Sequence, residues 1–222
     1  MDKTIQLQKL RDIILEWNEK INVTAIRDPQ EFDRKNVQDS LSILGLAEYE
    51  QAKTVLDLGT GGGFPGLPLA ICSPEKAFVL ADAIGKKLKV VQAAAQALSL
   101  VNVETVHARA EDMAKTKVHR ERYDLVVSRA VANMATLSEY CLPFVRTGGF
   151  FIAYKTGDAA EEIEAAKPAI AKLGGRILRI EKASPNNDAL WNDHVLVVVE
   201  KTAKTPKEYP RKAGTPGKDP LK

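Results

Sequence analysis

The chain has 222 residues, of which 45% are hydrophobic and 27% charged, and its formal net charge is +3. This composition is typical of a globular protein, and the length suits one sizeable domain. No apolar run reaches the roughly 18 residues of a membrane span, and the amphipathic N-terminus lacks the apolar centre of a signal peptide, so we expect a cytoplasmic protein without a membrane partner.

The cysteines and histidines exclude two further kinds of site. Cys72 and Cys141 are far apart, which excludes a disulfide framework and a C-x-x-C pair, so we expect two reduced thiols. The three histidines are scattered along the chain without the spacing of a metal site. We therefore predict that the protein binds no metal.

The positive charge is concentrated at the C-terminus. Residues 201–222 hold seven Lys and Arg against two acids, a balance of +5 that leaves residues 1–200 at −2. The same segment holds four prolines and two glycines, so we expect a basic, proline-rich tail with little regular structure. Two interpretations stay open: a solvated end, or a segment that contacts a polyanion such as RNA.

Residues 1–50 are predicted to form a helical N-terminal extension. Apolar residues recur at steps of three and four from Leu7 to Ile21, which is the pattern of an amphipathic helix. Asn22-Val23-Thr24 interrupts this pattern, and Asp28-Pro29 then supplies a helix cap followed by a favourable first helical residue. We expect a second helix from this point to about Leu46.

Residues 51–200 alternate between short apolar runs and amphipathic stretches. We expect strands at 54–58, 77–80, 103–107, 125–127, 150–154, 176–180 and 195–199, and helices at 67–71, 86–98, 134–141 and 159–173. Strands that alternate with helices predict an α/β fold, here a mostly parallel seven-stranded sheet with helices on both faces. The last two strands have no long helix between them, so we expect one of them, at the C-terminal end of the domain, to be antiparallel.

The stretch DLGTGGGFPG, residues 57–66, has five glycines in ten positions directly after an apolar run. Its backbone is therefore predicted to approach a ligand beyond the carboxyl ends of the strands. The pattern G-x-G-x-x-G within it fits a dinucleotide. However, Asp57 would repel a pyrophosphate, and Pro65 removes a backbone N–H that an anion site would use. No Gly-Lys-Ser/Thr follows, which excludes a P-loop.

S-adenosylmethionine fits these residues better than a dinucleotide, because it has no phosphate and its sulfonium and ammonium groups are positive. Asp82 ends the next strand, where a carboxylate can accept the ribose hydroxyls of a nucleoside cofactor; NAD would use it equally well. Ala110-Glu111 follows the third strand, near the expected position of the adenine. A helix cap at Asp82 and a surface charge at Glu111 are the alternatives.

With other stretches along nearly the whole chain, these residues resemble the RsmG (glucose-inhibited division protein B) family of 16S ribosomal RNA guanine-N7 methyltransferases. The resemblance rests on residues 22–29, Asp39-Ser40, residues 57–66, Asp82 with Lys86-Lys87, Ala110-Glu111, Ser128-Arg129-Ala130 and Tyr209-Pro210-Arg211-Lys212. Two positions depart from the family's pattern: Asn36 stands where histidine is usual, and Lys155-Thr156-Gly157 replaces Lys-Gly.

The resemblance implies a Rossmann-like class I methyltransferase that uses S-adenosyl-L-methionine to methylate N7 of a specific guanine in small-subunit (16S) ribosomal RNA. The partner would be 16S ribosomal RNA or a precursor of the small ribosomal subunit, and we expect the protein to be a monomer. The expected cofactor-binding residues are Gly59, Gly61, Phe64, Asp82, Ala83, Ile84, Ala110, Glu111 and Arg129. Lys155, Arg211 and Lys212 are candidates for substrate binding.

Guanine N7 has a lone pair and carries no proton, so its attack on a sulfonium methyl needs no general base. The expected work of the protein is to hold the reactants in line, with Arg129 as the candidate positioning residue through the cofactor carboxylate or an RNA phosphate. An NAD(P)-dependent oxidoreductase and a non-catalytic RNA-binding protein are the alternatives. Asp57 and Pro65 argue against the first, and the run of cofactor-site residues argues against the second. The C-terminal tail is expected to add nothing to cofactor affinity.

Overall fold

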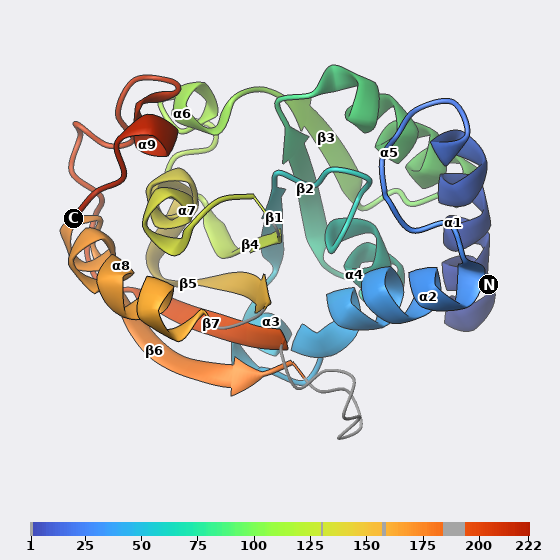
Figure 1. The fold of residues 1–222 in the computed structure, drawn as a ribbon, viewed down its shortest axis with the longest axis horizontal. Coiled ribbons are helices and arrows are strands. Elements are labelled where there is room, and N and C mark those ends of the chain that lie inside the picture. Colours follow the sequence, from blue (N-terminus) through green and yellow to red (C-terminus); the bar gives the residue numbers. More distant parts are fainter. Residues whose placement is uncertain (1, 130, 157–158, 184–193) are drawn as a thin grey trace.

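The computed structural model describes residues 2–129, 131–156, 159–183 and 194–222. Its centre is a seven-stranded sheet with helices on both faces (Figure 1), which confirms the predicted α/β fold. Ala130, from a stretch that carries the family resemblance, and Gly157, from a stretch that departs from the family's pattern, lie outside the described residues.

The sheet has the strand order β3-β2-β1-β4-β5-β7-β6. Strands β1 to β5 are parallel to their neighbours in this set, whereas β7 runs antiparallel to both β5 and β6. This confirms the prediction of one antiparallel strand near the C-terminal end. The strands are β1 (Thr54–Leu58), β2 (Ala77–Asp82), β3 (Val103–His107), β4 (Tyr123–Arg129), β5 (Val145–Thr156), β6 (Gly175–Lys182) and β7 (His194–Lys201).

Both faces of the sheet are buried, which is why the central strands are continuous apolar runs. In β1, Val55 packs into the core on one face, and Leu56 and Leu58 pack into the core on the other. Helices α1 (Lys3–Asn18), α2 (Pro29–Phe32), α4 (Gly66–Cys72) and α5 (Gly85–Ala97) cover the first face (Figure 1). Helices α6 (Ala110–Met113), α7 (Met134–Cys141) and α8 (Ala160–Lys172) cover the second.

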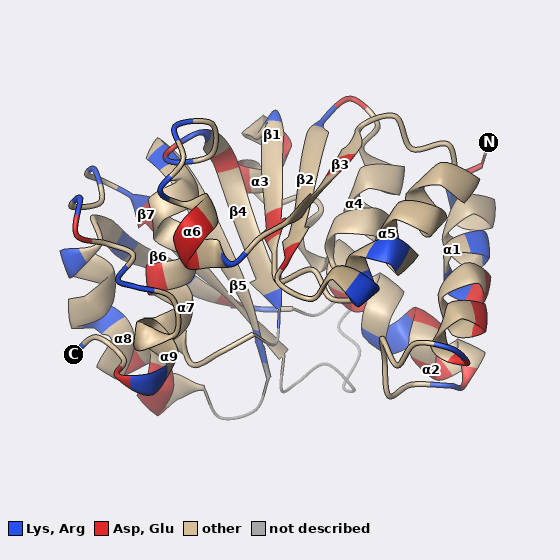
Figure 2. Cartoon of the chain, turned by 90° about the horizontal axis from the view of Figure 1, so that it is seen from above, with Lys and Arg blue, Asp and Glu red and all other residues tan. Residues whose placement is uncertain are grey.

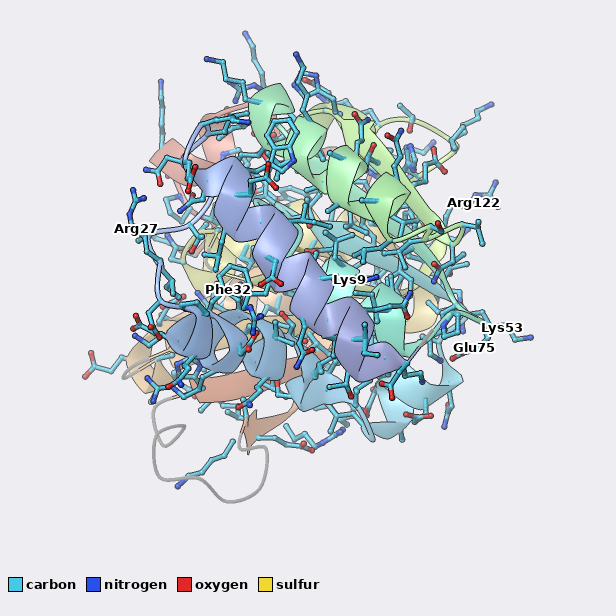
Figure 3. All side chains as sticks on the ribbon, turned by 90° about the vertical axis from the view of Figure 1, so that its right-hand side faces the viewer. Lys9, Arg27, Phe32, Lys53, Glu75 and Arg122 are labelled. Atoms are coloured by element: carbon cyan, nitrogen blue, oxygen red, sulfur yellow. The ribbon has the colours of Figure 1, made fainter. Side chains whose placement is uncertain are left out.

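The N-terminal segment belongs to the same core as the sheet. Leu10 and Ile14 of α1 and Phe32 of α2 are fully buried in the cluster that contains Val55. Figure 3 shows α1 lying across this side of the molecule, with Arg27 at the opposite end from Lys53 and Arg122. Helix α1 therefore supports the sheet rather than standing apart from it. None of the helices in the described parts of the chain combines the length and apolar character that crossing a membrane requires.

The predicted second helix, from residue 28 to about Leu46, is present as a continuous helical segment over residues 29–43, but it is not a regular α-helix throughout. Asp28 caps α2 as expected, accepting a hydrogen bond from the Glu31 N–H at 2.8 Å. The chain then passes through a π-helix, Asp33–Gln38, and a short 3₁₀ helix, Leu41–Ile43, before α3 (Ala47–Gln51). Side-chain donors bond the main-chain carbonyls here: Arg129 donates to the Lys35 carbonyl and Ser40 to the Asn36 carbonyl. Such bonds compete with the regular α-helical ladder.

The C-terminal tail has little regular structure, as expected, and its one helix in the described structure is the short α9 (Thr215–Lys218). It is nevertheless packed against the domain. The Arg120 guanidinium donates to the main-chain carbonyls of Thr205, Pro206 and Tyr209 at 2.8–3.1 Å. The Lys201 ammonium is fully buried and donates to Thr205 Oγ1 at 2.6 Å. Its pKa falls to about 8 because burial disfavours the charged form.

Candidate active site

A cavity of about 360 Å³ lies beyond the carboxyl ends of β1, β2 and β3. It opens where the strand order reverses, because β1 has β2 on one side and β4 on the other. Ligands of open α/β sheets bind at such a switch point. The residues that line it are Leu58, Gly59, Gly61, Ala81, Asp82, Ala83, Ile84, Lys87, Ala108, Arg109, Ala110, Glu111, Val131 and Tyr140.

Seven of the nine residues expected to bind the cofactor meet in this cavity: Gly59, Gly61, Asp82, Ala83, Ile84, Ala110 and Glu111. They come from three separate turns, after β1, after β2 and after β3. The carboxyl ends of parallel strands meet at one edge of the sheet, so segments about 20 residues apart in the chain become neighbours.

The turn after β1 takes backbone conformations that favour glycine. Gly59 and Gly61 have φ angles of +74° and +58°, a region that residues with a Cβ rarely adopt. A Cβ on Gly59 would lie 2.6 Å from Val131 Cγ2, whereas a Cβ on Gly61 would meet only the Gly59 carbonyl oxygen, at 4.0 Å. Gly61 therefore leaves open space beside the cavity that a side chain would fill.

Asp57 holds the glycine turn from behind and does not line the cavity. Its carboxylate is fully buried and accepts hydrogen bonds from Thr60 Oγ1 at 2.6 Å and from the Gly66 N–H at 2.8 Å. Its second oxygen, Oδ1, has no hydrogen-bond partner in the described structure. Burial raises the pKa of Asp57 to about 6, against the lowering effect of these two bonds and of the Arg129 charge. The charge that argues against a pyrophosphate in the sequence thus lies behind the glycine turn, and the Asp57 carboxylate positions that turn through its bonds to Thr60 and Gly66.

Asp82 joins the first two turns of the site. One carboxylate oxygen accepts the Gly61 N–H and the other accepts the Ile84 N–H, each at 2.8 Å. The alternative of a helix cap at Asp82 is wrong, because the N-cap residue of α5 is Ile84 and, in the described structure, no side chain accepts a hydrogen bond from the first turn of this helix. Because Asp82 also lines the cavity, and a carboxylate oxygen can accept more than one hydrogen bond, these two bonds leave acceptor capacity for a ligand.

Glu111 forms part of the far wall of the cavity, and it is buried rather than a surface charge. Its Oε1 accepts the main-chain N–H of Gly214, from the C-terminal tail, at 2.8 Å. Tyr140 of α7 lines the cavity next to it. The C-terminal tail therefore contacts the wall of the cofactor site. This contact is not predicted by the sequence, from which the tail is expected to add nothing to cofactor affinity.

Phe64 and Arg129 lie outside the cavity lining. The Phe64 ring is buried and packs edge-on against Phe32, with centroids 5.4 Å apart. The Arg129 guanidinium lies 5.7 Å from the Phe64 ring centroid and donates to Asp39 Oδ2 at 2.8 Å and to Asn36 Oδ1 at 2.9 Å. The structure thus brings Arg129 to the N-terminal segment. Asn36, in the place of the family's usual histidine, becomes a partner of this arginine.

The three candidate substrate-binding residues differ in their surroundings. Lys155 is mostly buried, and its ammonium lies 2.6 Å from Glu162 of α8. Arg211 forms a bidentate ion pair with Glu139, which is fully buried in α7. Lys212 is exposed, and its side chain has no hydrogen-bond or ionic partner in the described structure. Only Lys212 therefore presents a free charge at the surface.

Seven residues that line the cavity were not predicted as site residues: Leu58, Ala81, Lys87, Ala108, Arg109, Val131 and Tyr140. Lys87 belongs to a stretch that carries the family resemblance, so that resemblance could have indicated it. Val131 and Tyr140 follow β4 at distances that no motif fixes. Figure 2 shows basic residues at the start of α5 and beside α6, near the carboxyl ends of the strands. In the described structure, no group of three His, Cys, Asp or Glu side chains could hold a metal ion.

The cavity fits a cationic nucleoside cofactor. Gly61 leaves open space at its edge, Asp82 offers a carboxylate, and the negative charge of Asp57 stands behind the glycine turn. With the strand order 3-2-1-4-5-7-6 and an antiparallel β7, these features define a Rossmann-like class I methyltransferase that uses S-adenosylmethionine.

Comparison with known proteins identifies the family. The family described as "GidB: rRNA small subunit methyltransferase G" matches residues 3–191. Proteins named ribosomal RNA small subunit methyltransferase G are similar over nearly the whole chain. The one from Clostridium perfringens (strain SM101) is 44% identical and covers 100% of this chain and 92% of its own. The one from Desulfitobacterium hafniense is 45% identical and covers 95% and 86%. The chain belongs to the rRNA small subunit methyltransferase G family.

Solved structures agree with this fold at low sequence identity. The Methanococcus jannaschii fibrillarin pre-rRNA processing protein is 14% identical, with a TM-score of 0.58 over 75% of this chain and 74% of its own. M. jannaschii TYW2 in complex with AdoMet is 17% identical, with a TM-score of 0.56 over 74% of each chain. At such identities the likeness concerns the fold alone.

Proposed function

We propose that the protein methylates N7 of a specific guanine in small-subunit (16S) ribosomal RNA, with S-adenosylmethionine as the methyl donor. The observation that carries the proposal is the cavity at the carboxyl edge of the sheet, where Gly61, Asp82 and Glu111 meet in a member of this family. The names of the relatives support ribosomal RNA as the substrate. The atom N7 is our proposal from the family resemblance.

The proposed cofactor contacts are the cavity residues. Asp82 accepts hydrogen bonds from ribose hydroxyls, Ile84 packs its exposed side chain on the nucleoside, and Glu111 contacts the adenine end. Gly59 and Gly61 let the backbone approach the methionine part. Arg129, held against the N-terminal segment, positions the substrate from outside the cavity.

Bound S-adenosylmethionine supplies an electrophilic methyl group on a sulfonium. The residues of the chain then have one task, which is to hold guanine N7 in line with that methyl; such orientation can contribute roughly 7–11 kcal/mol. Because N7 carries no proton, no side chain has to act as a base. No metal is needed either, since the lone pair is already available. N7 lies on the Hoogsteen edge of the base, so the guanine is reached in a loop or unstacked.

The RNA backbone is proposed to contact the free cations around the cavity. Lys87 and Arg109 line the cavity and Lys212 is exposed on the tail. Lys155 and Arg211 are held in internal ion pairs, so we assign them to support of the site. We further propose that the protein acts as a monomer in the cytoplasm, where ribosomal subunits are assembled.

The test is a comparison of small-subunit RNA from cells with and without the protein. N7-methylguanine is detected by mass mapping and by strand scission after borohydride and aniline treatment. We expect one guanine to lose its methyl group without the protein, and to regain it with the wild type but not with Gly61→Val. Unchanged RNA would refute the proposal, and a methyl on another atom would refute the N7 assignment. Calorimetry with NAD and NADP tests the oxidoreductase alternative, for which binding of either would be required.

A further inference from the structure

The C-terminal segment Tyr209–Asp219, here called the C-terminal strap, crosses the outside of the cofactor-site wall. Figure 1 shows its helix α9 next to α6 and α7, and those two helices carry Glu111 and Tyr140 of the cavity. The strap is far from the cavity in sequence, since 103 residues separate Glu111 from Gly214. Its contacts with α6 and α7 are therefore tertiary and specific to the folded chain.

The first contact is a buried ion pair with α7. The Glu139 carboxylate is fully buried, and Arg211 donates to it from its main-chain N–H at 2.8 Å, from Nε at 3.0 Å and from Nη2 at 2.7 Å. Arg211 Nη2 also donates to the Asp219 carbonyl at 2.6 Å, which closes the strap on itself. A buried carboxylate is costly without its partner, so this pair fixes the strap to α7.

The second contact reaches the cavity itself. The Gly214 main-chain N–H donates to Glu111 Oε1 at 2.8 Å. Gly214 has a φ angle of +84°, a conformation that favours glycine at this position. Because Glu111 lines the cavity, the orientation of its carboxylate depends on the strap.

A third contact holds the strap beside Tyr140. The buried side chain of Thr136, in α7, donates a hydrogen bond from Oγ1 to the Pro216 carbonyl at 2.9 Å. Gly217 lies so close to Tyr140 that a Cβ there would be 3.5 Å from the tyrosine Oη. The strap therefore backs the two side chains, Glu111 and Tyr140, that form the far wall of the cavity.

We infer that the C-terminal strap is a positioning element of the cofactor site, in which Arg211 and Gly214 fix Glu111 and Tyr140 for the nucleoside. This deepens the proposed function and rests on it for the identity of the cofactor. It reverses the expectation, drawn from charge alone, that the tail adds nothing to cofactor affinity. Coupling between two sites is reciprocal, so a ligand in the cavity must also stabilise the strap.

Hydrogen exchange of the unmodified full-length protein tests this reciprocity directly. S-adenosylhomocysteine at saturation should slow exchange in peptides that cover residues 211–215, because the Gly214 N–H is bonded to Glu111. Peptides from the β6–β7 edge serve as the internal control and should not change. Binding without added protection of the strap would overturn the inference. No binding of S-adenosylhomocysteine at all would instead overturn the proposed function.

Variants give the complementary measurement. Arg211→Lys keeps a charge for Glu139 but loses the bidentate fork, and Arg211→Met removes both. We expect the dissociation constant for S-adenosylhomocysteine to rise at least about fivefold in Arg211→Met and less in Arg211→Lys, a range typical of coupled sites. Lys207→Met removes an exposed charge from the same tail and should stay within about twofold of the wild type.

Enzyme kinetics separates positioning from general damage. If the strap acts only on the cofactor wall, Arg211→Lys should raise KM for S-adenosylmethionine while kcat at saturation stays near the wild-type value. Thermal unfolding of each variant shows whether it is folded. Folded Arg211 variants with unchanged affinity for S-adenosylhomocysteine would refute the inference.

Discussion

Asp57→Asn tests whether the Asp57 carboxylate that holds the glycine turn is ionised. The carboxylate is fully buried, accepts two hydrogen bonds through one oxygen, and leaves Oδ1 without a partner in the described structure. Asparagine keeps an acceptor oxygen for Thr60 and Gly66 but cannot ionise. The substitution therefore removes the charge with little change of shape.

The magnitude follows from the shift of the Asp57 pKa, from 3.8 to about 6. The folded protein holds this proton more tightly than the unfolded chain, so the residue's contribution to stability is complete below pH 3.8 and is lost as the pH rises to about 6. A shift of about two pKa units corresponds to about 3 kcal/mol in the free energy of unfolding. Asparagine does not ionise, so the free energy of unfolding of the Asp57→Asn variant does not contain this pH-dependent loss.

The assay is urea unfolding of both proteins at a series of pH values from about 3.5 to 7. The free energy of unfolding of the wild type, minus that of Asp57→Asn, should fall by about 3 kcal/mol across this range. Two parallel pH profiles would refute a buried ionisation at Asp57. The same variant should bind S-adenosylmethionine more weakly, and S-adenosylhomocysteine should lose less affinity, because its sulfur carries no positive charge for the carboxylate to attract.

Three further substitutions test the site. Gly61→Val should abolish S-adenosylhomocysteine binding in calorimetry, because its side chain would enter the open space at a φ of +58°; retained affinity would place the ligand elsewhere. Asp82→Ala should weaken that binding roughly ten- to a hundredfold, from lost hydrogen bonds to a charged acceptor, and a loss below about threefold would contradict a ribose contact. Arg129→Lys keeps the charge but cannot bridge Asp39, Asn36 and the Lys35 carbonyl. The Arg129→Lys variant should fold but transfer methyl groups more slowly than the wild type. Full activity would show that the planar guanidinium of Arg129 does not contribute to methyl transfer.

The sequence by itself determined the sheet and the position of the cofactor cavity. The strands are buried on both faces, so their apolar runs are visible without tertiary information. Ligands of such sheets bind at the carboxyl ends of the strands, and the turns after β1, β2 and β3 could therefore be predicted to meet. Gly61, Asp82 and Glu111 lie together in the cavity for this reason.

The change from α-helix to π-helix and 3₁₀ helix within the second N-terminal helix could not be predicted from local patterns. Asp28 and Pro29 signal a helix start correctly, but the π-helix that follows is bonded to Arg129, which lies about 90 residues later in the chain. Helix signals describe neighbouring residues and contain no information about such a partner.

The tertiary structure alone decided the roles of the charged residues. Asp57 is turned to the back of the glycine turn, Arg129 to the N-terminal segment, and Arg211 into a buried pair with Glu139. From composition, the tail is a run of positive charge that could equally be solvated. Its packing depends on a buried carboxylate in α7 and on the Glu111 carboxylate in the cavity wall. A charged side chain that is buried points toward the partner that offsets the cost of its desolvation. Which residue is that partner is decided only when distant segments of the chain come together in the fold.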